Sequence, residues 1–229
     1  MITYYLPLTA SHFSDTERDM LRFISEDRRS LIDRLRFNDS KMLSLYSALL
    51  ARYSLNEVTG EPVSGFVFDR TEKGKPFVIG HEDIDINISH TKGMIICSVC
   101  DTGKVGVDVE HIRPVKYNIM KRCFHPDEIK YVNASADCDN PKNADFDHEH
   151  DFHFFEIWTK KEAFTKYLGT GLAIDITSIN ILSEEHNDRL FGFRSEDYVF
   201  AVYCDDIKKV SPVCISREEL ISAILSFGV

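Results

Sequence analysis

The sequence has no apolar run long enough to cross a membrane and no excess of basic charge. Its longest apolar stretches, such as 94–97, fall far below the roughly 20 residues that a membrane-spanning helix needs. A basic stretch followed by a long apolar run and a cleavage site, typical of a secretory signal, is missing at the N-terminus. The formal net charge of −10 disfavours a general nucleic-acid-binding protein, which is usually basic. We therefore expect a cytoplasmic protein that binds neither membranes nor nucleic acid.

The sequence also lacks the paired CxxC motifs of a zinc site and the nucleophilic serine motif of a hydrolase. Of the six cysteines, Cys97 and Cys100 form a CxxC pattern, but no second pair completes a zinc site. Both lie in a strand-like run, where residues three apart point to opposite faces, so the thiols should diverge. No Gly-x-Ser-x-Gly turn is present to expose a nucleophilic serine. We expect the cysteines to be mainly buried and structural.

The chain has enough apolar material for a substantial core, since 43% of its 229 residues are hydrophobic. Apolar periodicity predicts helices over 17–24, 28–35, 40–54, 117–124, 126–134, 152–168 and 218–227. Short apolar or alternating runs predict strands over 66–69, 76–79, 84–88, 94–99, 105–109, 176–182, 190–193 and 198–204. Together these elements predict an α+β fold with a seam near residue 105.

Negative charge is concentrated in one stretch, 134–153, which has six acidic residues against one lysine. Its polar composition predicts a loop over 136–150. The histidines of 147–153 lie among carboxylates, so this tract is either a solvated loop or a transition-metal site. Because the acids gather here, the rest of the chain can still present a positive pocket.

Two carboxylates lie close together in the predicted strand 105–109 and directly after it. Asp108 and Glu110 are two residues apart, so both emerge on one face of the strand. Adjacent acids repel each other and are tolerated chiefly when a cation lies between them. Oxygen ligands favour Mg²⁺ or Mn²⁺ over zinc. The alternative is an exposed strand with two solvated acids.

The helix predicted over 152–168 adds a third acid and a base. Glu162 and Lys166 are four residues apart and therefore lie on one helix surface. As a surface ion pair they would contribute only ~0.3–0.5 kcal/mol. Beside Asp108 and Glu110, however, they would suit the cleavage of a phosphoanhydride, which requires phosphate oxygens to be held and negative charge to be stabilised.

Two earlier segments can also contact phosphate. Lys75 and Pro76 follow a glycine in a tight turn before a strand, and Ser89 and His90 end a strand with a hydroxyl and an imidazole. Either segment alone is equally compatible with a solvated turn or a simple strand end.

Read in order, the segments 74–76, 87–90, 106–110 and 158–166 resemble the successive signatures of the Sfp-type phosphopantetheinyl transferases. The resemblance spans roughly residues 1–202, and the chain length is similar to that of the long, monomeric subfamily. The resemblance implies two similar α+β halves, 1–104 and 105–229, in a pseudo-dimeric fold with the active site in the cleft between them. It also implies transfer of the 4'-phosphopantetheine arm of coenzyme A to a serine of an apo-carrier protein, with release of 3',5'-ADP.

The same resemblance assigns roles to individual residues. Asp108, Glu110 and Glu162 would hold Mg²⁺. Glu162 would also help to deprotonate the carrier serine, directly or through water. Lys166 would stabilise the departing 3',5'-ADP, and Glu128 would be an assisting acid. The coenzyme A site would comprise Arg28, Lys41, Lys75, Pro76, Ser89 and His90, together with Asp108 and Lys166.

The chain departs from the family at Leu31 and Leu43, where relatives often have bases for the 3'-phosphate; Arg28 is a reasonable substitute. A docking surface for the carrier would include Val115, Ile119, Met120 and Phe124, although these residues could equally pack the core. Two other functions are compatible with the same acids. One is a different Mg²⁺-dependent enzyme that cleaves a phosphodiester or pyrophosphate, and the other is a non-catalytic coenzyme A-binding relative.

Overall fold

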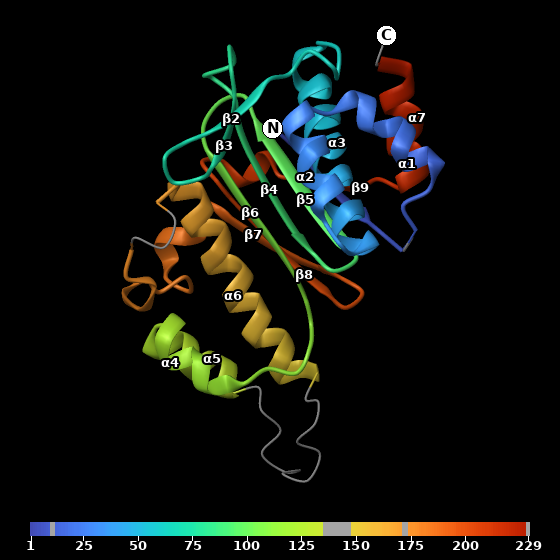
Figure 1. Ribbon diagram of the computed structural model, residues 1–229. Helices are drawn as coiled ribbons and strands as arrows, with labels where there is room; N and C mark the ends of the chain where they lie inside the picture. The colour runs from blue at the N-terminus through green and yellow to red at the C-terminus, as the bar shows by residue number, and fades with distance from the viewer. Residues whose placement is uncertain (10–11, 135–147, 171–173, 228–229) are drawn as a thin grey trace.

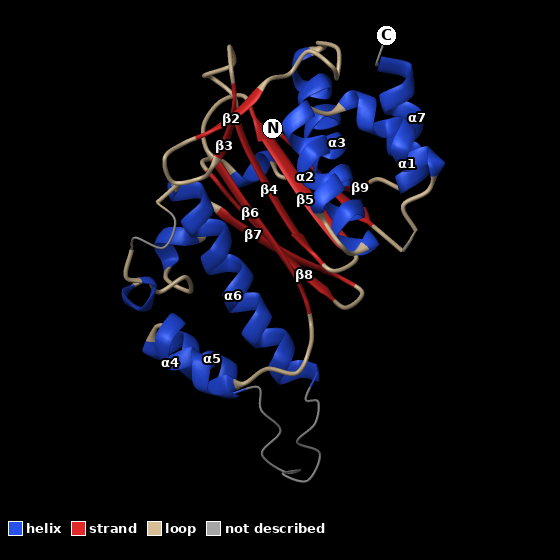
Figure 2. Ribbon diagram, viewed as in Figure 1, coloured by secondary structure: helices blue, strands red, loops and turns tan. Residues whose placement is uncertain are grey.

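The computed structural model describes residues 1–9, 12–134, 148–170 and 174–227. Two β-sheets cross the middle of the molecule, and helices cover them on the outer sides (Figure 1, Figure 2). The α+β class predicted from the sequence is confirmed. No described helix is long and apolar enough to span a membrane.

The first sheet has the strand order β4-β5-β1-β9. Its strands are β1 (Ile2–Pro7), β4 (Asp85–Thr91), β5 (Met94–Cys100) and β9 (Pro212–Cys214). β5 is antiparallel to both β4 and β1, whereas β9 runs parallel to β1. Every residue of β5 is buried, because it lies between two strands and beneath a helix. A separate hairpin is formed by β2 (Phe68–Arg70) and β3 (Pro76–Val78).

Four helices pack around the first sheet: α1 (Asp15–Met20), α2 (Glu26–Arg34), α3 (Asn38–Thr59) and α7 (Arg217–Phe227). α3 lies against β5 and ends at Gly60, whose left-handed φ of 75° closes the helix. The fully buried Glu17 of α1 accepts hydrogen bonds from Tyr46 of α3 at 2.8 Å and from Arg217 of α7. One carboxylate thus joins three helices.

The second sheet has the order β6-β8-β7, with all pairs antiparallel. It comprises β6 (Val105–His111), β7 (Leu190–Ser195) and β8 (Tyr198–Cys204). The helices on this side are α4 (Met120–Cys123), α5 (Pro126–Ala134) and α6 (His148–Leu168). Short 3₁₀ turns lie at Leu21–Phe23, between α1 and α2, and at Tyr117–Ile119, Ile176–Ser178, Glu184–His186 and Ile207–Lys209. α6 packs across β6 and β8, and it carries two of the predicted site residues.

Side chains of β4 join the two sheets where β4 passes alongside β6. Asp85 accepts a hydrogen bond from the backbone N–H of Val105 at 2.8 Å. Two residues further along, Asn87 Oδ1 accepts one from the N–H of Val107 at 2.9 Å. The first, third and fifth residues of a strand point to the same side, so Asp85, Asn87 and Ser89 all face β6. This seam is where the sequence predicts the active site.

Several sequence predictions about the elements need correction. α6 begins at His148, so the loop predicted as far as residue 150 is wrong there; the buried Asp151 shows that tertiary packing outweighs the polar composition. The strand predicted over 176–182 is also wrong. Its first residues form a 3₁₀ turn, capped by the Asp175 side chain accepting from the N–H of Thr177. β1 and β9 were not identified from their apolar pattern.

The last elements of the chain return to the first sheet. β9 pairs with β1, and α7 packs against α3. The division into halves 1–104 and 105–229 stays a prediction; in the structure, residues 212–227 lie with the N-terminal elements. The prediction that the thiols of the CxxC pattern diverge is confirmed, because Cys97 and Cys100 are buried in two different apolar clusters. Cys138 and most of the acidic stretch lie outside the described residues.

Candidate active site

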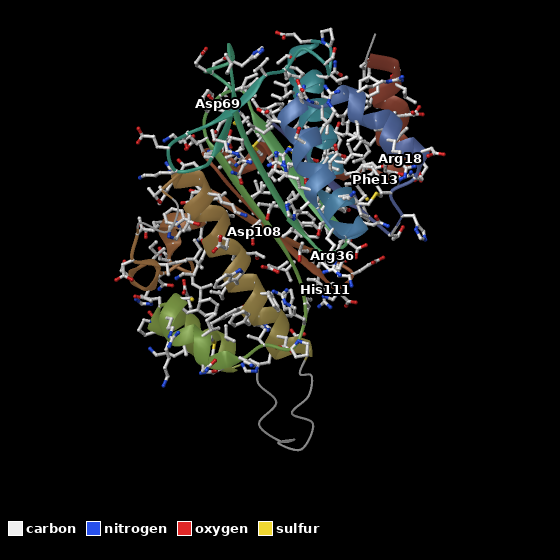
Figure 3. The ribbon with its side chains drawn as sticks, in the orientation of Figure 1. Phe13, Arg18, Arg36, Asp69, Asp108 and His111 are labelled. Carbon is white, nitrogen blue, oxygen red and sulfur yellow. The ribbon has the colours of Figure 1, made fainter. Side chains whose placement is uncertain are left out.

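Asp108 of β6 is the centre of a polar cluster at the seam (Figure 3). Its side chain is 7% exposed, and its Oδ1 accepts hydrogen bonds from Lys166 Nζ at 2.6 Å and from Ser89 Oγ at 2.7 Å. Lys166 also donates to Ser89 Oγ at 3.0 Å. Asp108 Oδ2, in contrast, is buried and has no hydrogen-bond partner among the described residues. A buried acceptor of this kind is costly unless something binds it.

Gly106 allows α6 to reach this cluster. A Cβ atom on Gly106 would lie 2.0 Å from the carbonyl oxygen of Ala163 and 2.3 Å from the backbone nitrogen of Tyr167. The helix backbone thus rests directly on the strand, two residues before Asp108. Glu162 and Lys166 are neighbours of these contact points in α6, so the close approach brings both toward Asp108.

The structure brings Glu162, Asp108 and Glu110 into one electrostatic neighbourhood. Burial raises the pKa of Glu162, and the negative charges of Asp108 and Glu110 raise it further, against the opposing effect of Lys166. Burial likewise raises the pKa of Glu110; Arg113 counteracts this rise, and Asp108 adds to it. A bound cation would lower the pKa of both acids by offsetting this mutual repulsion.

Arg113 is a site neighbour that the sequence analysis missed. Its guanidinium donates to Glu110 Oε2 at 2.8 Å and to the carbonyl of His111 at 2.7 Å. It also lies over the Phe155 ring, 4.5 Å from the centroid. The available signal was its position three residues after Glu110, just beyond the strand.

Two of the three acids are paired with bases as they are placed here. Lys166 is bonded to Asp108, and Arg113 to Glu110, whereas the Glu162 carboxylate has no described hydrogen-bond or ion-pair partner. Among the described residues, no three His, Cys, Asp or Glu side chains are close enough together to hold a metal ion, which also applies to the described histidines of α6. The free Asp108 Oδ2 and the unpartnered Glu162 nevertheless provide oxygen donors that suit Mg²⁺.

His90, near the end of β4, experiences the charges of two bases. The surrounding protein lowers the pKa of His90, and the charges of Lys166 and Arg28 lower it further. Burial, followed by the charge of Arg70, lowers the pKa of Arg28. Lys41 lies elsewhere, with its ammonium 5.9 Å from the centroid of the Phe13 ring.

The two positions that depart from the family differ in burial. Leu31 is exposed, and Leu43 packs against the core of the first sheet. Of the predicted bases Arg28 and Lys41, Arg28 is the one whose charge acts on His90.

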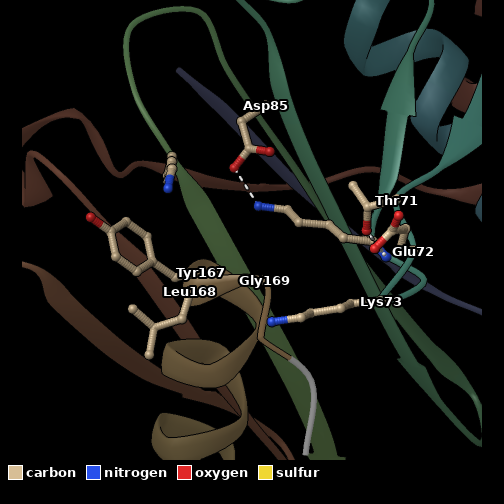
Figure 4. Close-up of a pocket in the computed structure, with 9 residues that line it drawn as sticks. Thr71, Glu72, Lys73, Asp85, Tyr167, Leu168 and Gly169 are labelled. Carbon is tan, nitrogen blue, oxygen red and sulfur yellow. Dashed lines mark hydrogen bonds and ion pairs between the residues drawn. The ribbon is translucent and has the colours of Figure 1, made fainter. Parts of the chain in front are cut away.

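Lys75 is placed at the other end of β4. Its ammonium donates to Asp85 at 2.5 Å and to the carbonyl of Val105 at 3.2 Å, so it bridges the seam (Figure 4). It lines a cavity of about 430 Å³ between the β2–β3 hairpin and the end of α6. Lys73, Lys104 and the Tyr167 ring contribute to the same cavity. Pro76 begins β3 directly after Lys75.

A larger cavity, of about 700 Å³, opens beside Glu110. Its lining combines basic side chains with apolar and aromatic ones: Arg113, Lys116, Lys121, Arg122, Val115, Ile119, Phe154, Phe155 and Trp158. Two of the four predicted docking residues, Val115 and Ile119, line it. Met120 and Phe124 are only 5% and 2% exposed and pack in the core of the second sheet, as the alternative interpretation allowed.

Glu128 lies in a buried ion pair apart from the other acids. It is fully buried, accepts from Lys161 Nζ at 2.6 Å, and also accepts from the N–H groups of His125 and Ile181 at 2.7 Å. Lys161 in turn donates to the carbonyl of Ile179 at 2.6 Å. None of the hydrogen bonds described for Glu128 involves Asp108, Glu110 or Glu162. The sequence offered no sign of this pair beyond a lysine next to Glu162.

Comparison with known proteins gives matches over most of the chain. Residues 104–221 match the model of the 4'-phosphopantetheinyl transferase superfamily, and residues 13–101 match that of the 4'-phosphopantetheinyl transferase N-terminal region. The chain is 29% identical over 175 residues to a 4'-phosphopantetheinyl transferase of Bacillus subtilis, covering 76% of this chain and 71% of the relative. A similar enzyme of Aneurinibacillus migulanus is 29% identical, covering 72% and 66%. The 4'-phosphopantetheinyl transferase HetI of Nostoc is 26% identical, covering 68% and 64%.

Proposed function

Since this chain belongs to the 4'-phosphopantetheinyl transferase superfamily, and is an enzyme that moves the phosphopantetheine arm of coenzyme A onto a carrier-protein serine, we propose that the transfer takes place where β4, β6 and α6 meet. The observation that carries this proposal is the buried, unpartnered Oδ2 of Asp108 beside Lys166, in the electrostatic neighbourhood of Glu162. The site combines acceptors for a cation with a base for phosphate.

Asp108, Glu110 and Glu162 would hold Mg²⁺, with Mn²⁺ as a substitute. Side-chain rotation is needed first, because Lys166 and Arg113 are paired with two of these acids. The Arg113 side chain is 51% exposed, so its rotation costs little, whereas moving Lys166 leaves the buried Asp108 carboxylate to be neutralised by the ion. When bound, the ion would neutralise the diphosphate of coenzyme A and polarise its phosphorus–oxygen bonds.

The reaction requires one bond to form and one to break. The carrier serine oxygen attacks the phosphorus attached to pantetheine, and the bond from that phosphorus to the bridging oxygen breaks. Its electron pair leaves with 3',5'-ADP. Glu162 accepts the serine proton, a role that its raised pKa favours. Lys166 would neutralise the charge that develops on the departing phosphate.

We assign the 3'-phosphate of coenzyme A to Arg28 and His90, and the adenine end to the cavity beside Lys75 and Pro76. The charges of Lys166 and Arg28 both act on His90 and disfavour its protonation, so an added anion would offset that repulsion. Lys73 and Lys104 supply further positive charge at the cavity. Lys41 would contribute only through its general charge, because its ammonium lies over Phe13.

The carrier protein would dock at the cavity beside Glu110. Four basic side chains surround Val115, Ile119 and aromatic rings there, a combination that suits an acidic partner with an apolar anchor. A net charge of −10 by itself would repel an acidic partner, and this local positive charge offsets that repulsion at the docking surface. The serine would then enter close to Glu110 and Glu162. Monomeric state and cytoplasmic location belong to the same proposal.

Mass spectrometry of several apo-carriers, incubated with enzyme, coenzyme A and Mg²⁺, tests the function. We expect the mass of one phosphopantetheinyl group to be added, and a chelator to prevent it. Asp108→Asn and Glu162→Gln should abolish transfer without unfolding the chain. Glu26→Gln, at an exposed position on α2, should keep the wild-type transfer activity. Full activity of Glu162→Gln would remove the proposed base.

A further inference from the structure

We propose that Asp151, in the first turn of α6, is a positioning residue for the surface on which the carrier protein docks. This inference rests on the docking cavity beside Glu110 proposed above. Asp151 is only 1% exposed, and its Oδ1 accepts a hydrogen bond from the backbone N–H of Val115 at 3.1 Å. Val115 lines the docking cavity and also packs against the core of the second sheet. Neither the solvated loop nor the transition-metal site considered for residues 147–153 includes such a role.

Asp151 lies on the helix face that forms the aromatic part of the cavity. Phe154 and Phe155 follow it by three and four residues, and Trp158 follows by seven, so the four side chains share one face of α6. The three aromatic residues all line the cavity. Asp151 therefore connects the aromatic part of the cavity, which α6 supplies, to the segment that supplies Val115.

That segment, residues 112–116, depends on contacts of this kind because its described residues belong to no helix or strand. Its first residue, Ile112, donates its N–H to a carbonyl of the β7–β8 turn at 2.7 Å. Pro114 has no N–H to donate. The bond from the Val115 N–H to Asp151 thus fixes the backbone directly after a residue that cannot be held in this way.

The consequence is that Val115 is ordered before the carrier arrives. Without the carboxylate, its backbone would be free to adopt other conformations, and carrier binding would have to order it. Ordering the backbone of one residue lowers affinity by about 5–30-fold. Asp151 would therefore act on carrier binding and not on the reacting groups.

The experiment measures transfer by the full chain to an apo-carrier that the wild-type enzyme modifies, with KM determined separately for the carrier and for coenzyme A. Asp151→Ala should raise KM for the carrier by about 5–30-fold and leave kcat and KM for coenzyme A at wild-type values. Asp151→Asn, which keeps an acceptor oxygen, should restore KM for the carrier. Glu149→Ala is the matched control, because it removes an exposed acid from the same helical turn and should change neither KM.

Hydrogen exchange of the Val115 amide, followed by nuclear magnetic resonance without ligands, provides a second measurement. We expect this amide to be protected in the wild type and in Asp151→Asn, and to exchange faster in Asp151→Ala, while the amides of β8 exchange as in the wild type. Asp151→Val replaces the alanine variant if that variant is unstable. An unprotected Val115 amide in the wild type, or a wild-type KM for the carrier in Asp151→Ala, would overturn the inference.

The double variant Lys116→Glu with Lys121→Glu separates this inference from the proposed docking cavity. If the double variant raises KM for the carrier and Asp151→Ala does not, the inference about Asp151 fails alone. If neither changes KM for the carrier, the proposed docking cavity is wrong and the inference fails with it.

Discussion

Replacing Gly106 by alanine should damage the site more than the size of one methyl group suggests. The new Cβ would lie 2.0 Å from the carbonyl oxygen of Ala163, 2.3 Å from the nitrogen of Tyr167 and 2.9 Å from its Cα. All three are backbone atoms of α6, so no side-chain rotation can relieve the overlap. Ordinary contact begins at 3.4 Å, which leaves a shortfall of about 1.4 Å.

The helix must therefore move away from β6, and Lys166 and Glu162 move with it. The contact between Lys166 Nζ and Asp108 Oδ1, now 2.6 Å, would lengthen beyond hydrogen-bond range. Overpacking of this kind typically costs about 1–3 kcal/mol of stability. In a chain of this size that lowers Tm by about 2–4 °C per kcal/mol. A displacement of about 1 Å at the reacting groups can cost ~10²-fold in rate.

The assay combines kcat for transfer to an apo-carrier with Tm from circular dichroism. Gly192→Ala is the matched control, since the same substitution on β7 meets the flexible end of Lys160 at 3.3 Å and the carbonyl oxygen of Phe200 at an ordinary contact distance of 3.7 Å. We expect a kcat loss of about two orders of magnitude in Gly106→Ala and near wild-type values in Gly192→Ala. Wild-type kcat and Tm in Gly106→Ala would refute the reasoning, because α6 would then not rest on the strand as described.

Three further predictions concern other parts of the chain. Burial alone would raise the pKa of Glu17, but hydrogen bonds from Ser14, Arg217 and Tyr46 lower it to about 2. Because the folded pKa is depressed, the stabilisation by Glu17 is complete above pH 4.5 and is lost as the pH falls toward 2. The free energy of unfolding in denaturant, measured between pH 6 and pH 3, should therefore depend less on pH in Glu17→Gln than in the wild type. Breaking the buried Glu128–Lys161 pair by Glu128→Gln or Lys161→Met should each cost about 3–5 kcal/mol of unfolding free energy, with a double variant less unstable than the sum; additive losses would contradict a direct pair. Lys116→Glu with Lys121→Glu should raise KM for the carrier and reduce its salt dependence without changing KM for coenzyme A, whereas Lys130→Glu, outside the cavity, should change neither.

Much of the candidate site could be predicted because its signals are local. The seven-residue pattern of β6 places Asp108 and Glu110 two apart on a strand, and helical spacing places Glu162 and Lys166 one turn apart on α6. These periodicities depend only on backbone geometry. The family signatures connect the two segments, and the electrostatic effects of the acids on one another are consistent with that connection.

Other features could not be predicted, since they depend on partners distant in sequence. The hydrogen bonds of Asp85, Asn87 and Ser89 could not be predicted, because their partners lie on β6 and come within reach only when β6 packs beside β4. For Met120 and Phe124 the sequence left a docking face and the core equally open, and only the packing of α4 and the residue after it placed both in the core of the second sheet. Glu128 looked like a further acid of the site and is instead neutralised by Lys161.

By itself, then, the sequence determined the α+β class, the family and the four charged residues of the candidate site, which are Asp108, Glu110, Glu162 and Lys166. Backbone periodicity and residue chemistry are properties of short segments, and they are already present in the unfolded chain. Only the tertiary structure decided which oxygen of Asp108 is left without a described partner, which serine donates to the other oxygen and why residue 106 must be glycine. Each of these depends on a contact between segments far apart in the chain, and burial and hydrogen-bond pairing exist only after those segments pack.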